Sequence, residues 1–570
     1  LHYEPAMGSP REDGYIDPSD SRYLKANDHS HRIQNPKDQY YVDVVSRMYP
    51  ALYTAPLLVN QNNGDHRPIF FCEYAHAMGN SAGNLIEFWD QWRSLPRVIG
   101  GCIWEFKDQA LTKNDANGKS YYVYGGDFDE KYFDDFTIKG IVNADGSPKG
   151  VMYECKRIFQ PVQVEWADKG KGLIKIINSS PVKNTKDYDL VLKIRTEGVI
   201  TSSHNLPSVD VRPEDSTVID ISKFIPKQKE KEMLIDISFN LRNNTPWDSK
   251  GYSIASNQLN ATALSRPYEF TSTISFKEMG NNFLAEGKTF KVAINKENGA
   301  LFSYILDGKE KIFAPLLPHF TRPQTDNDKR GWKTQNVLKR WYENQPKLTG
   351  VKVDIQNGKE GILSSYQMVN DSVEIKVFYT VSKEGVLKVD YSLVADEHLP
   401  CIPKIGMQMG IDKNLTELKW YGRGPMENYI DKNYGTDIGI YDLNIYRFME
   451  NYVVPQENGN RTDVRWMQLK EKADKNGILI TADSLLSMSA WPYTEKNISE
   501  ARHTIDLQGA GYITLNIDLI QMGVGGNDSW SEVAAPLGQY QIRPGNYSYS
   551  FYISPRDILL RRKVGETKKQ

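Results

Sequence analysis

The sequence predicts a multidomain chain in which half of a parallel (β/α)8 barrel is followed by two β-sandwiches. Residues 1–160 alternate between short apolar runs and helical patterns, which is typical of parallel strands joined by crossover helices. Residues 161–270 change to short alternating segments separated by Gly, Asn, Pro and Lys, which indicates an antiparallel sandwich. Residues 271–560 continue this β pattern with few helical windows, which indicates a larger sandwich.

The predicted barrel half has four strands, at Leu1–Glu4, Val42–Tyr49, Ile69–Tyr74 and Val98–Phe106. An open half-barrel leaves two strand edges unpaired and one apolar face uncovered, which natural proteins avoid. The sequence also begins at Leu1, with no Met and no signal peptide. We therefore expect the other half of the barrel to lie upstream of this residue.

The third of these strands begins the clearest βα unit, PIFFCEYAHAMGN at residues 68–80. Its apolar run Ile69–Cys72 is too short for a helix and is typical of a buried strand. Apolar residues then recur at i, i+3, i+4 and i+7, namely Leu85, Phe88, Trp89 and Trp92. This spacing predicts a helix, and Pro96 ends it. Glu73 therefore lies at a strand end, where (β/α)8 barrels carry their chemistry.

Polar and aromatic residues lie at the ends of successive strands, namely Tyr49, Glu73, Tyr74, His76 and Trp104. Because neighbouring strand ends converge on one face of a barrel, we expect these side chains to share a pocket. A carboxylate beside a phenol and an indole suits glycoside hydrolysis, in which the carboxylate attacks the anomeric carbon. The alternatives are that Glu73 only ends a core strand and that Trp104 is a core aromatic. Strand alternation sends Glu105 to the side opposite Trp104, which makes it a weaker catalytic candidate.

The composition excludes several classes of partner. The 70 Lys and Arg residues balance 72 Asp and Glu residues, so nothing suggests binding to nucleic acid or to an anionic membrane. No apolar run approaches the roughly 18 residues that span a bilayer. The four cysteines are scattered without CxxC spacing, and we expect free, mostly buried thiols.

Two further motifs have competing interpretations. The glycine-rich MGVGGNDSW at residues 522–530 lacks the lysine and the strand–helix context of a phosphate loop, so it predicts a tight turn in the last sandwich; the alternative is that it approaches the active site. Asp326, Asn327 and Asp328 are compatible with a cation site, but an acidic surface loop is the commoner case.

The segment FFCEYAHAMGNSAGN resembles the nucleophile motif of glycoside hydrolase family 2, particularly the large bacterial β-galactosidases. The similarity continues through GGCIWEFKDQAL, YGGDFD, FTRPQTDND, WYGRGPMENYIDK, YVVPQENGNR and MGVGGNDSW, and so covers essentially the whole chain. It implies a TIM barrel that begins at about strand five and ends near residue 160. It also implies an immunoglobulin-like sandwich at 161–270, a large small-chain-type sandwich at 271–560 and a basic tail at 561–570.

The resemblance assigns a role to each strand-end residue. Glu73 would be the nucleophile of a retaining mechanism, Tyr49 would hydrogen-bond it, Tyr74 and His76 would contact the sugar, and Trp104 would be the galactose platform. The family carries its acid/base carboxylate in an Asn-Glu pair, which this sequence lacks. Its Mg²⁺ ligands also lie largely upstream of Leu1. The resemblance therefore implies an active parent protein and an isolated chain that is inactive.

The sequence departs from the family at two places. The family's Na⁺ site uses a phenylalanine carbonyl and an asparagine; here Phe136 is present but Lys139 stands in place of the asparagine. We predict that the Lys139 ammonium supplies the positive charge and makes Na⁺ unnecessary; the alternative is an exposed lysine. The family's aglycone-binding aromatic aligns near Thr514, so the outer sugar site is expected to differ, with Tyr512 as a candidate.

The function implied is removal of terminal β-D-galactose from β-galactosides. The alternatives are another family 2 specificity, such as β-glucuronidase or β-mannosidase, and a non-catalytic carbohydrate-binding or assembly module. The resemblance also implies a homo-oligomer in the full-length form. It further implies a soluble bacterial protein, either cytoplasmic or periplasmic, without nucleic-acid or membrane partners.

Overall fold

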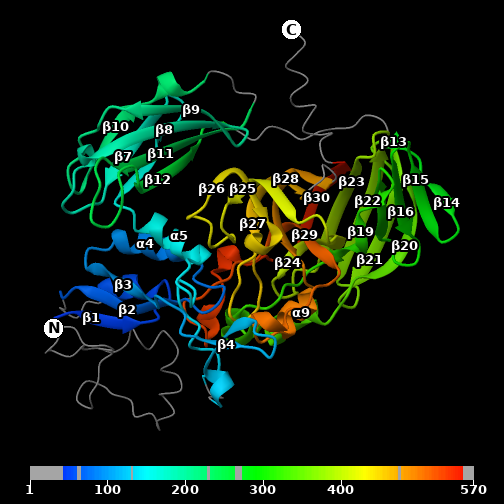
Figure 1. The fold of residues 1–570 in the computed structure, drawn as a ribbon, viewed down its shortest axis with the longest axis horizontal. Helices are drawn as coiled ribbons and strands as arrows, with labels where there is room; N and C mark the ends of the chain where they lie inside the picture. Colours follow the sequence, from blue (N-terminus) through cyan, green and yellow to red (C-terminus); the bar gives the residue numbers. More distant parts are fainter. Residues whose placement is uncertain are drawn as a thin grey trace.

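The computed structural model describes residues 43–60, 66–129, 133–226, 231–262, 273–472 and 477–555. Three regions follow one another along the chain (Figure 1). A small parallel sheet with helices comes first, a compact sandwich second, and a much larger β region third. The predicted strand Leu1–Glu4 and the basic tail at 561–570 lie outside the described residues.

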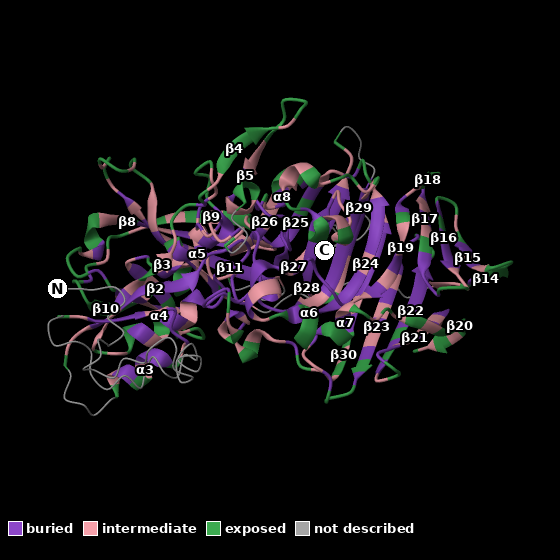
Figure 2. Cartoon of the chain, turned by 90° about the horizontal axis from the view of Figure 1, so that it is seen from below, coloured by how far each residue is buried: buried purple, intermediate pink, exposed green. Residues whose placement is uncertain are grey.

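The first region contains a three-stranded parallel sheet in the order β1-β2-β3. Its strands are β1 (Val45–Met48), β2 (Ile69–His76) and β3 (Val98–Trp104), and its helices are α3 (Thr54–Val59), α4 (Leu85–Arg93) and α5 (Gly150–Ile158). A hairpin of β4 (Leu111–Asn114) and β5 (Ser120–Val123) leaves this region and is largely exposed (Figure 2). The three described strands confirm the predicted parallel arrangement.

Helix α4 forms where the apolar spacing predicts it and ends at Arg93, before Pro96. Leu85, Phe88 and Trp92 make its buried face. The indole of Trp92 stacks on Phe71 of β2 with 4.7 Å between ring centroids. This packing fixes the back of β2, so that the opposite side of the strand is free to present polar groups.

The second region is a sandwich of two antiparallel sheets, in the orders β10-β7-β6 and β12-β11-β8-β9. Its strands are β6 (Val162–Asp168), β7 (Leu173–Asn178), β8 (Tyr188–Thr196), β9 (Val199–Leu206), β10 (Asp215–Asp220), β11 (Met233–Leu241) and β12 (Ser253–Asn260). Alternating inward residues such as Ile174, Ile176, Leu192 and Ile194 form its core. This confirms the predicted change from helices to sandwich strands.

The third region is one continuous network of eighteen strands. They are β13 (Thr273–Ile274), β14 (Lys277–Met279), β15 (Asn282–Glu286), β16 (Phe290–Asn295), β17 (Leu301–Leu306), β18 (Lys309–Glu310), β19 (Ile312–His319), β20 (Lys347–Gln356), β21 (Lys359–Met368), β22 (Val373–Ser382), β23 (Leu387–Ala395), β24 (Lys404–Asp412), β25 (Glu417–Gly424), β26 (Asp437–Asn444), β27 (Arg461–Lys470), β28 (Gly477–Trp491), β29 (Tyr512–Gln521) and β30 (Asn546–Pro555). The predicted large β-sandwich is confirmed.

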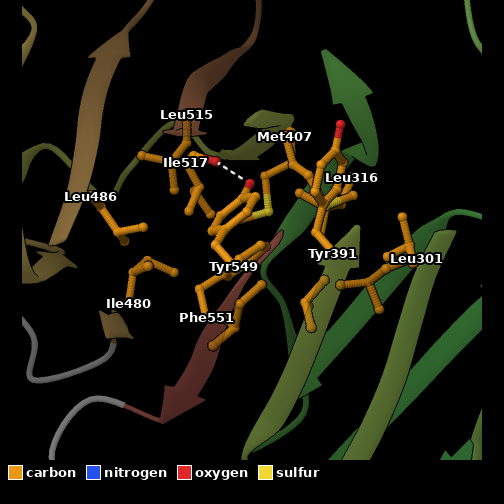
Figure 3. Close-up of a cluster of buried hydrophobic side chains, with 14 of the residues drawn as sticks. Leu301, Leu316, Tyr391, Met407, Ile480, Leu486, Leu515, Ile517, Tyr549 and Phe551 are labelled. Carbon is orange, nitrogen blue, oxygen red and sulfur yellow. Dashed lines mark hydrogen bonds between the residues drawn. The ribbon is translucent and has the colours of Figure 1, made fainter. Parts of the chain in front are cut away.

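The core of this region is apolar and includes several buried tyrosines, some of which hydrogen-bond the backbone (Figure 3). Tyr549 donates its hydroxyl to the carbonyl of Ile517 at 2.8 Å, for example. Two connections of this region extend toward the parallel sheet: a π-helical turn η4 (Asn327–Gly331) and the loop 522–531 that follows β29. These two connections take part in the site described below.

None of the helices in the described part of the chain combines the length and the apolarity needed to cross a membrane. All four cysteines are free thiols, as predicted. Only Cys72 and Cys155 are buried, because Cys102 faces outward on β3 and Cys401 is half-buried.

Candidate active site

Glu73 and Tyr49 lie together at the ends of two adjacent parallel strands. Glu73 is on β2 and is 5% exposed, and Tyr49 directly follows β1. The Tyr49 amide donates to the Glu73 carbonyl at 2.7 Å, and the Tyr49 hydroxyl hydrogen-bonds the Glu73 side chain. Burial, followed by this hydrogen bond and the Glu73 charge, raises the pKa of Tyr49 well above its usual 10. The phenol therefore stays protonated and donates to the carboxylate.

His76, at the end of β2, is 2% exposed and approaches the C-terminal region directly. Its Nδ1 lies 2.8 Å from Oγ of Ser529, and that hydroxyl donates to Oδ1 of Asn327 at 2.8 Å. Burial and the nearby Lys139 charge lower the pKa of His76 to about 3. The imidazole is therefore neutral at physiological pH.

Three aromatic rings surround this histidine. Trp530 lies edge-on to Tyr49, with 4.6 Å between centroids, and 5.3 Å from the ring of His76. Phe136 lies 5.8 Å from His76 and 6.5 Å from Trp530. Trp530 is 41% exposed, which leaves an indole surface beside the carboxylate site. Apolar indole and phenyl faces are suited to contact the C–H face of a sugar.

The other two strand-end candidates, Trp104 and Tyr74, lie in different surroundings. Trp104 ends β3 in register with His76 and is partly buried, so it adjoins the site. Tyr74 is fully buried, accepts a hydrogen bond from Trp89 Nε1 at 2.7 Å, and packs against Trp92. Strict alternation does not explain this position, because Phe71 and Tyr74 both pack against Trp92; the register of β2 against β3 shifts between these two residues. The position of Tyr74 in the core does not support its predicted contact with the sugar.

Lys139 is not an exposed lysine. Its Nζ lies 2.9 Å from Oε1 of Glu105, and the two side chains are 14% and 22% exposed. The Glu105 amide also donates to the Lys139 carbonyl at 2.7 Å, which ties the segment after β3 to the Phe136–Lys139 turn. The ammonium therefore has a fixed place near His76, and Glu105 is engaged as its partner.

The glycine-rich loop at 522–530 approaches the candidate site, as the alternative interpretation of this motif expects. The Gly83 amide donates to the Gly525 carbonyl at 2.8 Å, immediately before helix α4. Gly526 has a φ of +115°, and a Cβ there would lie 2.8 Å from the Ala82 amide nitrogen. Only glycine allows this approach of two backbones, and it delivers Ser529 and Trp530 to the strand ends.

The interpretation of residues 326–328 as an acidic surface loop is wrong, because all three residues are buried. Asp328 forms a bidentate pair with the buried Arg322, with both N–O distances 3.0 Å. Asn327 belongs to η4 and reaches Ser529. The apparent surface loop is thus an internal support of the site.

Tyr512 and Thr514 occupy the start of β29, where Thr514 donates to the Tyr493 carbonyl at 2.7 Å. Their predicted relation to an outer sugar site stays a prediction. Across the described ranges, no group of three or more His, Cys, Asp or Glu side chains is arranged to hold a metal ion.

A buried carboxylate held by a phenol at adjacent parallel strand ends, with a neutral imidazole and indole surfaces beside it, is an arrangement that suits the glycoside hydrolase class. Family models agree with it along the chain. "Glycosyl hydrolases family 2, TIM barrel domain" matches residues 17–164, "Beta-galactosidase, domain 4" matches 174–262, and "Beta galactosidase small chain" matches 286–553. The chain belongs to glycoside hydrolase family 2.

Curated relatives support this assignment. A protein named "Beta-galactosidase" from Priestia megaterium is 30% identical over 538 residues, which cover 92% of this chain and 51% of the relative. Another of that name, from Halalkalibacterium halodurans, is 30% identical over 525 residues, with 90% and 51% covered. The chain thus spans about half the length of these relatives. Among solved structures, a galactose mutarotase related enzyme from Lactobacillus acidophilus matches 48% of this chain and 97% of its own at 11% identity, with a TM-score of only 0.29.

Proposed function

We propose that this chain carries the nucleophile half of a retaining β-galactosidase site, which removes terminal non-reducing β-D-galactose. A Glu73 oxygen bonds to the anomeric carbon as the bond to the leaving oxygen breaks, and water later displaces Glu73 to release galactose. The hydrogen bond between Tyr49 and Glu73 is the observation that carries the proposal. The names of the curated relatives favour galactose over other sugars.

The other site residues have supporting roles in this proposal. Tyr49 orients the carboxylate and donates to it before the attack. His76 contacts a sugar hydroxyl, Trp104 carries the apolar face of galactose, and Phe136 closes the side of the pocket next to His76. These roles are proposed from the positions of the side chains at neighbouring strand ends and around His76.

We further propose that β1, β2 and β3 are strands six to eight of the barrel. The second carboxylate, expected about 5–5.5 Å from Glu73, and the Mg²⁺ ligands then belong to the part of the relatives that this chain does not span. General acid assistance typically contributes about 10²–10⁴-fold, so this chain alone is proposed to be inactive on ordinary galactosides. A homo-oligomer, in the cytoplasm or the periplasm, is proposed for the full-length form.

We also propose that Lys139 takes the part that Na⁺ plays in other family members. Its ammonium is held at 2.9 Å from Glu105 and acts electrostatically on His76, so a compact positive charge is already in place. A bound Na⁺ beside it would meet a like charge. The proposal concerns only this charge and leaves the Mg²⁺ requirement unchanged.

A panel of nitrophenyl glycosides tests the galactosidase proposal in the longest form of the protein that contains this chain. We expect hydrolysis of the β-galactoside, and a loss of roughly 10⁴-fold or more in Glu73→Gln. Glu343→Gln, at a glutamate whose side chain is 62% exposed, is the matched control and should retain activity. Hydrolysis of a β-glucuronide or β-mannoside in place of the galactoside would overturn the specificity. Absence of hydrolysis of every glycoside would favour a binding or assembly module.

A further inference from the structure

We infer that the C-terminal sandwich fixes the tautomer of His76, so that its Nε2 meets the substrate as a hydrogen-bond acceptor. Three buried polar groups form a directional chain of hydrogen bonds that ends on Nδ1 of this histidine. The substrate part of the inference rests on the proposed function. The tautomer itself is a property of the folded chain and is testable without any activity.

The chain begins at the side-chain amide of Asn327. Its Nδ2 donates to the carbonyl oxygen of Val524 at 3.1 Å. Turning the amide over would place its oxygen against that carbonyl oxygen, with two acceptors facing each other. The amide is therefore oriented, and its Oδ1 is directed to Ser529.

Ser529 transmits this direction. A serine hydroxyl has a single proton, and the Ser529 hydroxyl donates it to Oδ1 of Asn327 at 2.8 Å. The remaining function of Oγ is to accept. Because His76 Nδ1 lies 2.8 Å from this oxygen, Nδ1 must carry the proton that joins them.

The second ring nitrogen then carries no proton. His76 is 2% exposed among the rings of Tyr49, Phe136 and Trp530. Burial in this apolar surround, with the Lys139 charge nearby, lowers the pKa of His76 to about 3, so a second proton is not held at neutral pH. No hydrogen-bond partner for Nε2 is found in the described residues, so an entering hydroxyl can donate to it.

The loop geometry keeps Ser529 in place. The carboxylate of Asp528 accepts from the amides of Trp530 and Ser531, at 3.2 and 3.0 Å, in a tight local turn. Asn327 is held within η4, from which Arg330 also pairs with Asp135 of the first region. Asn327 and Ser529 are thus positioning residues that act through His76, and neither needs to touch the substrate.

The tautomer makes a chemical prediction about the ligand. A group that recognises His76 Nε2 must donate a hydrogen bond, which a sugar hydroxyl does. A fluorine in place of that hydroxyl cannot donate, whereas it still accepts weakly. Replacing the contacted hydroxyl by fluorine should therefore be as damaging as deleting it, and this distinguishes an accepting Nε2 from a donating one.

Nitrogen NMR of the chain labelled with ¹⁵N-histidine tests the tautomer, with the His76 signals assigned by their loss in His76→Gln. We expect a pyrrole-type Nδ1 and a pyridine-type Nε2 at pH 7. Ser529→Ala should shift both signals toward a mixture of tautomers, and Ser529→Thr should restore the wild-type pattern. Ser548→Ala, at an exposed position of β30, is the control. A pyrrole-type Nε2, an imidazolium, or signals unchanged in Ser529→Ala would overturn the inference.

The substrate part is tested with singly deoxygenated and singly fluorinated β-galactosides on the longest form of the protein. We expect one ring position at which both changes raise KM by a similar factor, at least tenfold, and at which both penalties disappear in His76→Gln. A fluorinated analogue that binds well where the deoxy analogue fails would overturn the accepting role. If no galactoside is hydrolysed, the proposed function fails, and the NMR result still decides the tautomer.

Discussion

Arg330 of the third region lies over the ring of Phe136 in the first region, with its guanidinium carbon 4.8 Å from the ring centroid. The same guanidinium hydrogen-bonds the carboxylate of Asp135 and lies 3.7 Å from that of Asp134. Phe136 in turn contacts His76. One arginine, nearly 200 positions further along the chain, therefore holds the loop that borders the candidate active site.

Replacing this arginine should loosen both the loop and the site. Asp135 is 6% exposed, so Arg330→Gln leaves a buried carboxylate without its cation, at a cost of about 1–3 kcal/mol in the free energy of unfolding. Denaturant unfolding measures this cost, with Lys329→Gln as the neighbouring control. In a cycle with Asp135→Asn, the double variant should cost less than the sum of the single variants. Additive costs would show that the two side chains do not interact.

His76 should make folding sensitive to acid. Its pKa is about 3 in the folded chain against about 6.5 when unfolded, so between these values the unfolded state binds a proton that the folded state does not. The stability it contributes is complete above pH 6.5 and is lost as the pH falls toward 3, by up to about 1.4 kcal/mol per pH unit. The denaturation midpoints measured between pH 7 and pH 4 should depend less steeply on pH in His76→Gln. In His398→Gln, at an exposed position, the midpoints should depend on pH as they do in the wild type. An equal pH dependence in both variants would contradict a buried, neutral His76.

Lys139 should make activity independent of Na⁺. Because the ammonium already occupies a fixed place beside Glu105, the full-length wild type should hydrolyse substrate equally in sodium and in choline salts at equal ionic strength. Lys139→Asn restores the residue typical of the family and should introduce a Na⁺ requirement, while Lys139→Gln should lower activity in both salts. A strict Na⁺ requirement in the wild type would refute the charge replacement.

Gly526 should tolerate no side chain. An added Cβ would come within 2.8 Å of the Ala82 backbone nitrogen and 2.9 Å of Asn327 Nδ2, at a φ of +115°. We expect Gly526→Ala to cost about 1–3 kcal/mol and to displace Ser529 from His76. Gly118→Ala separates the two causes, because Gly118 also has a positive φ, of +81°, but open space around it. Equal losses of thermal stability in the two variants would show that backbone strain alone is responsible.

Local patterns in the sequence predict the local parts of this structure. The run before Glu73 gives β2, and the spacing of Leu85, Phe88 and Trp92 gives α4, because burial on one side of an element leaves a period in the sequence. The same reasoning places Glu73, His76 and Trp104 at strand ends. The core position of Tyr74 does not follow from this period, because the register of β2 against β3 shifts between Phe71 and Tyr74.

The contacts between the regions of the fold leave no periodic pattern in the sequence. Ser529 is 453 positions from His76. The glycine-rich segment around Ser529 has the local pattern of an ordinary turn. Asp326 to Asp328 look like a surface loop because nothing nearby in the sequence signals that Arg322 will pair with Asp328 inside the protein. Such pairings depend on how whole regions dock, so only the three-dimensional structure shows them. The tryptophan that ends the glycine-rich motif was the one available signal for this part of the site.

The most direct test of the central claim is covalent trapping of the nucleophile. A 2-deoxy-2-fluoro-β-D-galactoside with a dinitrophenolate leaving group needs no acid to depart, so it reports on the nucleophile separately from the second carboxylate. Applied to the longest form of the protein and read by peptide mass spectrometry, it should leave one fluorogalactosyl group on the peptide that contains Glu73, and none in Glu73→Gln. Label on another carboxylate of the wild type, or equal labelling of Glu73→Gln, would contradict the account.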